Sequence, residues 1–551
     1  MLLCACSGEK KQSEKFGGYL RTNEFQKHKT LFPLQIDEIN NYHIACQIYE
    51  GLVRFDNELN ILPALAKSWE INADRNQYAF HLRHNVLFHK NSCFGKDSTR
   101  QVNANDILFC FERLCTNTPE NRQYAVTFKD HVLGAGAYYA GEAKKLSGVE
   151  VINDSTVQIT LTHPDPNFLS VLAMAGCFIY PKEAWQKYGN DMATKAVGTG
   201  PFTLQRSATD KSLSLVKNQF YWGTDEEGNS LPYLDSVCWS FQSDRMAELE
   251  MFKNNQLDMM YRVPAANIKP LFDAQANDSS RFDFEVYSAP ALSVHFYGFN
   301  LQKKSPFQNS LVRKAINMAI DRQAIIDEVF QGEGTAANAG VVPYNLAFDK
   351  AGFPYKEIKG FEYNPDSAKK LLQKAGYGDK KKLPELTLDI NDGNGGKNLL
   401  TAIKVEKMLK KNLDINVNMN IVQWAEHIDQ VQNGKSNFYR YAWVADYADP
   451  ESFLTMFYGK HVPSDTITRS YVNLSRFSNK MFDTFFEDAQ KASDEKIRMH
   501  LLGKAAQVLI DEAAFVPLYY DENIRVVKKR VHNLQENAMN YIDFRNVWIS
   551  K

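Results

Sequence analysis

The chain has 551 residues, of which 44% are hydrophobic and 23% charged, and its 64 Lys and Arg against 65 Asp and Glu give a formal net charge of −1. The mean hydropathy of −0.42 excludes a polytopic membrane protein, and the hydrophobic content excludes a disordered chain. A balanced chain lacks the positive field that supplies most non-specific affinity for nucleic acid, so we expect no nucleic-acid partner. At about 150 residues per domain, the length favours about three to four domain-sized units.

The first residues are similar to the end of a lipoprotein signal. In residues 3–6 (LCAC) a large apolar residue stands three before Cys6 and a small one immediately before it, as in a bacterial lipobox, and the polar stretch 7–18 then predicts a tether. A lipid on Cys6 would hold the protein at a membrane surface without a spanning helix. The alternative is a chance tetrapeptide. The most apolar stretch, 168–180, is 13 residues long, against roughly 20 needed to cross a bilayer.

Cysteines are confined to the first 238 residues, and none has the spacing of a zinc site. Cys93, Cys110 and Cys115 lie near one another along the chain, so one local disulfide is an alternative to buried free thiols, which the pattern favours. The full set is Cys4, Cys6, Cys46, Cys93, Cys110, Cys115, Cys177 and Cys238.

Short apolar runs alternate with turn signals between residues 49 and 161. A helix is expected to begin near Asn105 or Asp106, because both are good N-cap residues and an apolar run follows. The apolar runs predict strands at 78–82, 86–88 and 157–161.

A strand–helix–strand unit is predicted in the second half of the chain. Residues 386–390 and 415–421 alternate as strands do, and 399–409 between them mostly keep helical spacing. Such a unit of about 35 residues is a βαβ unit, which is right-handed. A second helix begins after Asn364 as its cap and ends with Gly376 as its C-cap. These elements predict a multidomain α/β protein.

The sequence contains no G-x-S-x-G, H-E-x-x-H or G-x-x-x-x-G-K-[ST] motif. The glycine-rich stretch 198–202 predicts a turn, because Pro201 lacks the N–H that a phosphate cradle would use. His81, His84 and His89 are spaced like metal ligands, but residues 81 and 84 of a strand point to opposite faces. We therefore expect no enzyme activity, no metal site and no cofactor.

One segment, 439–450, combines an aromatic strand with carboxylates. Asp446 can be a simple turn acceptor, or it can meet the cation of a ligand in a dry site with Trp443 packed over it. Arg440 precedes Trp443 by three, so a regular strand directs it to the opposite face unless a bulge or a wrapping ligand intervenes.

Several further segments between Ile48 and Val526 carry a family resemblance. Each segment alone is weak evidence, but together, in this order and at this spacing, they are strong evidence. They are 49–56, 63–70, 78–89, 103–107, 198–202, 221–223, 306–309, 312–322 and 516–520. With them, the chain resembles family 5 of the bacterial extracellular solute-binding proteins, the peptide- and nickel-binding group that feeds ABC importers.

The resemblance implies an α/β fold, a two-lobed periplasmic-binding-protein clamshell of the large type II class, with an extra β-rich subdomain on the N-terminal lobe and the ligand enclosed between lobes. The implied divisions are a lipobox remnant and tether at 1–18, the core of lobe I at 19–51, 174–287 and 521–551, the extra subdomain at 52–173, and lobe II at 288–520.

The resemblance also implies binding residues. In peptide-binding members an Asp shortly after a Trp binds the α-ammonium of the peptide, and this role carries over to Asp446. In some members an Arg three residues before that Trp assists the carboxyl end of the ligand, and Arg440 matches this position. Another basic residue that pairs with the ligand carboxylate in the family has no counterpart here, because position 431 is Val. The resemblance therefore leaves the length of the ligand open. The residues expected at the site are Arg440, Trp443, Val444, Ala445, Asp446, Tyr447 and, from the N-terminal subdomain, Tyr124.

The function that the resemblance implies is a lipid-anchored, monomeric receptor on the periplasmic or extracytoplasmic face. It would capture short peptides through the free N-terminus and main chain and present them to the permease and ATPase subunits of an ABC importer. The alternatives are a nickel chelate, a haem or an oligosaccharide as ligand on the same scaffold. A secreted hydrolase that uses Asp446 and Asp449, and a surface adhesin or sensor, are further alternatives.

Overall fold

The computed structural model describes residues 15–550, apart from 210, 262, 265–266, 268–269, 271–281, 379, 392, 394–395 and 466–467; at 206–209 it describes the backbone alone. Cys6, the predicted site of lipidation, lies outside the described residues, as does most of the predicted tether. Within the described part, none of the helices has both the length and the apolar character that a membrane span requires.

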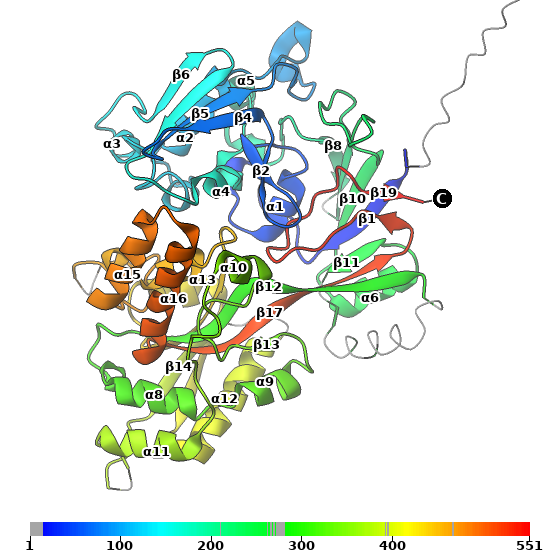
Figure 1. The fold of residues 1–551 in the computed structure, drawn as a ribbon. Helices are drawn as coiled ribbons and strands as arrows, with labels where there is room; N and C mark the ends of the chain where they lie inside the picture. Colours follow the sequence, from blue (N-terminus) through cyan, green and yellow to red (C-terminus); the bar gives the residue numbers. More distant parts are fainter. Residues whose placement is uncertain are drawn as a thin grey trace, which may run out of the picture.

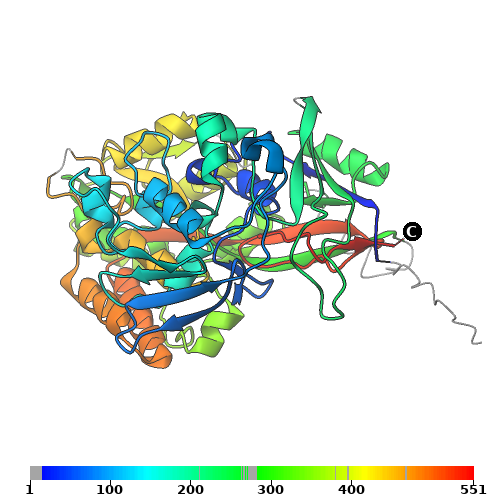
Figure 2. The same ribbon diagram turned by 90° about the horizontal axis from the view of Figure 1, so that it is seen from above.

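Two lobes stack in the view of Figure 1, and two long antiparallel strands run through both of them. These strands are β12 (Phe284–Phe299) and β17 (Phe515–Lys528), which pair from Phe284↔Lys528 to Gly298↔Phe515 with register shifts between Pro290 and Val294 and between His295 and Phe296. Seen from above, they extend across most of the molecule (Figure 2). The chain therefore passes between the lobes within one continuous pair of strands.

The upper lobe contains a four-stranded sheet in the order β1-β10-β9-β8, in which β1 is parallel to β10 and the other neighbours are antiparallel. Leu213 and Leu215 of β9 are buried while the residues between and beside them are not, which is the alternation of a sheet with one covered face. The elements of this lobe are β1 (Tyr19–Glu24), α1 (Ile39–Ala45), α5 (Lys182–Tyr188), β8 (Phe202–Thr209), β9 (Ser212–Lys217), β10 (Ser236–Phe241) and α6 (Arg245–Lys253).

A β-rich subdomain extends the upper lobe. Its antiparallel sheet has the order β4-β5-β7-β6, and α2 (Ala104–Leu114) packs against β6 and β7. The predicted strands 78–82 and 157–161 are confirmed as β5 and β7. The elements are β2 (Val53–Phe55), β3 (Ile61–Pro63), β4 (Ala66–Ile71), β5 (Gln77–Leu82), α3 (Ala135–Tyr139), β6 (Val149–Asn153), β7 (Thr156–Thr160) and α4 (Phe168–Leu172).

Two predictions in this subdomain are wrong in detail. The N-cap of α2 is Asn103, not Asn105 or Asp106, because Asn103 accepts from the N–H of Asn105 while the Asp106 carboxylate reaches back to the Asn103 N–H in a capping box. Residues 86–88 are not a strand. Their pairing is a single antiparallel bridge, Leu87↔Gln101, although Val86 and Phe88 are buried.

The lower lobe is a sheet covered by helices on both faces. The sheet has the order β11-β17-β12-β16-β14-β15, with β13 beside β17. Tyr297 and Phe299 pack with α8, α9, α11 and α12 on one face, and Val294 and Phe296 pack with α10, α14, α15 and α16 on the other. The other elements of this lobe are α8 (Ser310–Met318), α9 (Arg322–Val329), β13 (Thr335–Ala336), α10 (Leu346–Ala351), α13 (Trp424–Gln432), α14 (Glu451–Leu454), α15 (Lys480–Lys491) and α16 (Glu495–Asp511). The end of the sheet at β11 (Met259–Tyr261) reaches the upper lobe beside β1, where the pair β18 (Val531–His532) and β19 (Trp548–Ile549) also lies.

The βαβ unit is confirmed. β14 (Leu386–Asn391) pairs in parallel with β15 (Val417–Val422), and α12 (Lys397–Leu413) connects them. The second predicted helix is α11 (Pro365–Lys374), capped by Asn364 as predicted, but its C-cap is Ala375, and Gly376 follows with a φ of +88°. A left-handed residue after the C-cap is the usual place for glycine.

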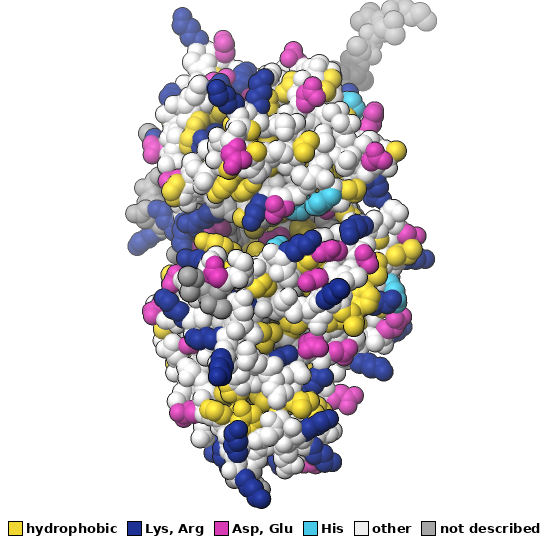
Figure 3. All heavy atoms as spheres, turned by 90° about the vertical axis from the view of Figure 1, so that its left-hand side faces the viewer, with side chains coloured by type: hydrophobic (Ala, Val, Ile, Leu, Met, Phe, Trp, Pro, Cys, Tyr) yellow, Lys and Arg dark blue, Asp and Glu magenta, His cyan; other side chains and the backbone are white. Residues whose placement is uncertain are grey.

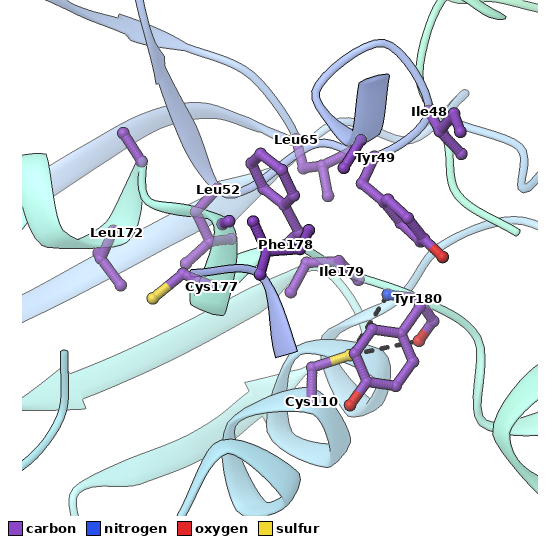
Figure 4. Close-up of a cluster of buried hydrophobic side chains, with 14 of the residues drawn as sticks. Ile48, Tyr49, Leu52, Leu65, Cys110, Leu172, Cys177, Phe178, Ile179 and Tyr180 are labelled. Carbon is purple, nitrogen blue, oxygen red and sulfur yellow. Dashed lines mark hydrogen bonds between the residues drawn. The ribbon is translucent and has the colours of Figure 1, made fainter. Parts of the chain in front are cut away.

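The largest core joins the upper lobe to its subdomain, and Figure 4 shows part of it. Tyr49 and Leu52 lie near Phe178 and Ile179, and the Cys110 thiol donates to the carbonyl of Tyr180 at 3.2 Å. All six described cysteines are free, so no disulfide links Cys93, Cys110 or Cys115. The residue boundaries predicted for the lobes and the subdomain stay a prediction.

The glycine-rich stretch 198–202 runs directly into β8 and lies against the chain at 47–48. A Cβ on Gly198 would meet the carbonyl oxygen of Ile48 at 2.1 Å, and one on Gly200 would meet that of Gln47 at 2.6 Å. These glycines therefore permit close packing of two backbone segments.

Candidate ligand-binding site

The candidate site lies at the end of β16 (Phe438–Val444). This strand pairs with β12 from Phe299↔Phe438 to Ser293↔Val444 without a register shift, and the chain leaves the sheet at Ala445. Side chains alternate between the two faces of such a strand. Trp443 therefore lies on the face that packs against Phe296 and Phe453, and Arg440 lies on the opposite face, as the odd offset predicts.

Asp446 follows the strand in a turn that leads to α14. Its backbone N–H donates to the buried hydroxyl of Ser452 at 2.9 Å, which fixes the turn. Among the described residues its carboxylate has no hydrogen-bond or ion-pair partner, so it is not a turn acceptor. Burial raises the pKa of Asp446 to about 6. An uncompensated carboxylate removed from water is costly unless a cation reaches it.

Three tyrosines lie near Asp446, and the hydroxyl of one of them, Tyr541, donates to the backbone carbonyl of Asp446 at 3.5 Å. Burial raises the pKa of Tyr441, Tyr447 and Tyr541, and the negative charge of Asp446 adds to the rise in each. The ring of Tyr541 lies 4.6 Å from that of Tyr42 and 5.5 Å from that of Phe55. The upper lobe therefore reaches Asp446 through Tyr541.

The other predicted site residues on this segment lie at the boundary of the lobes. The Tyr447 hydroxyl donates to Glu451 at 3.2 Å, and its ring packs against the core of the upper lobe. Ala445 is buried and donates its N–H to the carbonyl of Leu292, whereas Val444 is 59% exposed.

Arg440 is held in a network of its own. Its Nη1 donates to Asn391 at 3.2 Å and its Nη2 to the Nδ1 of His295 at 2.8 Å. His295 stacks on Tyr519, with 4.2 Å between ring centroids, and its Nε2 lies 3.2 Å from Asp521. The structure thus separates Arg440 from the face of Trp443, and its predicted role at the carboxyl end of a ligand stays a prediction.

Tyr124 is placed in the core of the β-rich subdomain. It is 6% exposed and stacks on Tyr139 with 4.0 Å between ring centroids, and burial raises its pKa to about 12. Its predicted place at the cleft stays a prediction.

Asp449 and the histidines have structural partners. Both guanidinium Nη atoms of Arg498 donate to Asp449, and both side chains are buried. His89 contacts the carbonyl of Gly200 through Nε2 at 2.9 Å, and His81 lies 3.4 Å from Glu70. Over the described ranges, no group of three or more His, Cys, Asp or Glu side chains is placed to hold a metal ion.

Sequence reasoning missed the residues of the upper lobe that meet this site. The Asn167 side chain donates to the Glu451 carboxylate at 2.5 Å. Away from the site, Arg75 also joins the lobes, by donating to the carbonyl of Ser493 at 3.4 Å. On the face that holds α3 and α15, Figure 3 shows a hollow across the molecule between the two halves, with charges of both signs along it. Nothing local in the sequence pairs positions 284 residues apart, as Asn167 and Glu451 are.

A family model described as bacterial extracellular solute-binding proteins, family 5 Middle, matches residues 60–464. The chain belongs to this family. Its members are solute-binding transport proteins rather than enzymes, and the predicted fold, a two-lobed type II periplasmic binding protein with an extra β-rich subdomain, is confirmed.

Three relatives illustrate the similarity. The chain is 29% identical to the dipeptide-binding protein DppE of Bacillus subtilis over 92% of this chain and 86% of that one. It is 28% identical to heme-binding protein A of Haemophilus influenzae over 94% and 89%. The solved structure of the periplasmic binding protein DppA from Helicobacter pylori, in complex with the peptide STSA, superimposes with a TM-score of 0.78 at 26% identity, covering 98% of this chain and 99% of that one.

Proposed function

We propose that this protein captures short peptides for an ABC importer and holds each peptide by its free N-terminus at Asp446. The observation that carries the proposal is a partly buried carboxylate without a partner among the described residues, placed where the two lobes meet. An α-ammonium has an ordinary pKa of about 7.7–8.0, so it is charged at neutral pH and pairs with a carboxylate through charge-assisted hydrogen bonds.

The surroundings of Asp446 suit an ammonium group. Tyr441, Tyr447 and Tyr541 are buried near Asp446, so an ammonium group that pairs with this carboxylate would be shielded from water. Beyond the amine, the peptide main chain would pair with backbone groups, as an added strand does, which gives affinity without sequence preference. Water in roomy side-chain pockets would adapt to different residues.

The names of the relatives support a peptide and supply one rival. DppE is named for dipeptides, and the Helicobacter pylori structure holds a tetrapeptide, whereas heme-binding protein A is named for haem. Haem has no ammonium group, so it would leave the Asp446 carboxylate without a cation. The same holds for an oligosaccharide. The geometry at Asp446 therefore favours a peptide over these alternatives.

The remaining parts of the proposal concern location and partners. A lipid on Cys6 would tether the monomeric receptor to the extracytoplasmic face of the membrane, and a permease with its ATPase would accept the peptide when the lobes open. The division of the chain into lobe I, the subdomain and lobe II at residues 51/52, 173/174, 287/288 and 520/521 belongs to this proposal.

Native mass spectrometry of protein purified from a bacterial host tests the function. We expect mass excesses that fragment into short peptides, because a closed cleft retains its ligand, and we expect tetra-alanine to displace them. The Asp446→Asn variant, prepared in parallel, should carry much less peptide. A haem or sugar mass, or protein that neither carries peptide nor binds tetra-alanine, would overturn the proposal.

A further inference from the structure

A cluster of polar groups spans the boundary of the lobes next to Asp446. At its centre is Glu451, the first residue of α14, which is partly buried. One carboxylate oxygen accepts from Asn167 of the upper lobe at 2.5 Å and from the Tyr447 hydroxyl at 3.2 Å, and the other accepts from Gln490 at 3.1 Å. All three donors are neutral, and no described residue forms an ion pair with Glu451.

Further charges face Glu451 from both sides. From the upper lobe comes Asp165, which is 7% exposed and lies 2.7 Å from the Nδ1 of His131. From the lower lobe comes Asp449, which Arg498 neutralises from α16. His131, Asp165, Glu451 and Arg498 line one narrow pocket between the lobes. The carboxylates of Asp165, Asp449 and Glu451 thus converge, and within the described part of the chain the basic side chains lining this pocket are Arg498, His131 and His163.

Some of these contacts depend on closure and others do not. Tyr447, Gln490, Asp449 and Arg498 share the lower lobe with Glu451, so they stay near it when the lobes separate. Asn167 and Asp165 belong to the upper lobe, near the start of α4, so their approach to Glu451 requires the closed form. His131 keeps its hydrogen bond to Asp165 in either form, because both lie in the β-rich subdomain.

We propose that Asn167 and Glu451 form a proton-linked latch between the lobes, in which closing buries Glu451 beside Asp165 and favours its protonated form. The closed form is therefore favoured as the pH falls. The latch rests on the proposed function in one respect: the closed form is the one that holds the peptide.

The sign of the linkage follows from the contacts. Burial, and then the charges of Asp165 and Asp449, raise the pKa of Glu451 in the closed form above its ordinary value. The closed form therefore binds more protons than the open one at pH values above about 4.3, the ordinary pKa of Glu. The stabilisation that protonation of Glu451 gives to the closed form is complete below that pH. It is lost as the pH rises through the raised pKa of Glu451.

Calorimetry of tetra-alanine binding to wild type and Glu451→Gln between pH 4.5 and 8 tests the latch. Asp446 titrates in the same pH range, and its ionisation strengthens peptide binding as the pH rises, whereas ionisation of Glu451 weakens it. The informative quantity is therefore the ratio of the wild-type Kd to the variant Kd at each pH. Gln is a neutral mimic of protonated Glu, and we expect the ratio to rise from near one at pH 4.5 by about tenfold for each unit by which closing raises the pKa. Glu495→Gln, an exposed carboxylate on Arg498, is the matched control and should leave the ratio near one at every pH.

The Asn167→Ala variant tests the contact itself, and we expect it to weaken binding about three- to tenfold, because it removes a hydrogen bond that only the closed form makes. A ratio that does not change with pH, or an Asn167→Ala Kd equal to that of wild type, would overturn the latch. If the wild type binds no peptide, the proposed function fails, and small-angle scattering without ligand then decides the latch. The wild type should have a smaller radius of gyration at pH 5 than at pH 7.5, and the Glu451→Gln variant should have the same radius at both. An equal radius at the two pH values in the wild type would contradict the latch.

Discussion

Replacing Asp446 with Asn should weaken peptide binding by about 3–5 kcal/mol, or about two to four orders of magnitude in Kd. Asn keeps the shape of the side chain and the turn to Ser452, but it leaves the peptide ammonium buried without a counter-charge. Isothermal titration with tetra-alanine measures the loss. A variant that binds within threefold of wild type would reject Asp446 as the amine site.

The same variant should be at least as stable as wild type when no ligand is bound. Burial raises the pKa of Asp446 to about 6, so its carboxylate lowers the stability of the ligand-free protein as the pH rises from about 4 through 6. At pH 7 the Asn variant should therefore gain on the order of 1–3 kcal/mol, and at pH 4 it should gain nothing. Urea unfolding at the two pH values checks this, and it also shows that lost binding is not lost folding.

The Asp449→Ala variant should lose about 3–5 kcal/mol of stability, because it leaves Arg498 buried with its main counter-charge removed. Asp449 also accepts from the N–H of Glu451 at 2.8 Å, so the turn that leads into α14 loses a hydrogen bond. Urea unfolding of the full chain, followed by tryptophan fluorescence, measures the change.

Glu495→Ala is the control for this prediction. Glu495 also contacts Arg498, at 3.0 Å, but its side chain is 52% exposed. Removing a solvent-exposed partner costs about 0–1 kcal/mol. Equal losses in the two variants would show that burial of the pair does not set its strength.

Local sequence patterns predicted much of the fold. The alternation in 386–390 and 415–421 located β14 and β15, and Asn364 followed by Pro365 located the start of α11, because strand period and helix caps act within a few residues. The pattern failed at 86–88, where apolar side chains are buried by the surrounding core but the backbone makes only one bridge.

The candidate site could be predicted only in part. An aromatic strand that ends near Asp446 is a local feature, and the register of β16 against β12 keeps Arg440 on the other face, as the spacing requires. Tyr541 and Asn167 come from distant parts of the chain and reach the site only after the lobes have folded. Such partners leave no periodic signal in the sequence.

The contact between a peptide amine and Asp446 is tested most directly by a thermodynamic cycle. Calorimetry would compare tetra-alanine with its N-acetylated form on wild type and on Asp446→Asn. We expect acetylation to weaken binding to wild type by about as much as the substitution weakens binding of the free peptide, and to cost the variant little more, because both changes remove one contact. Losses that simply add, or an acetylated peptide that binds wild type as tightly as the free one, would show that Asp446 does not bind the amine.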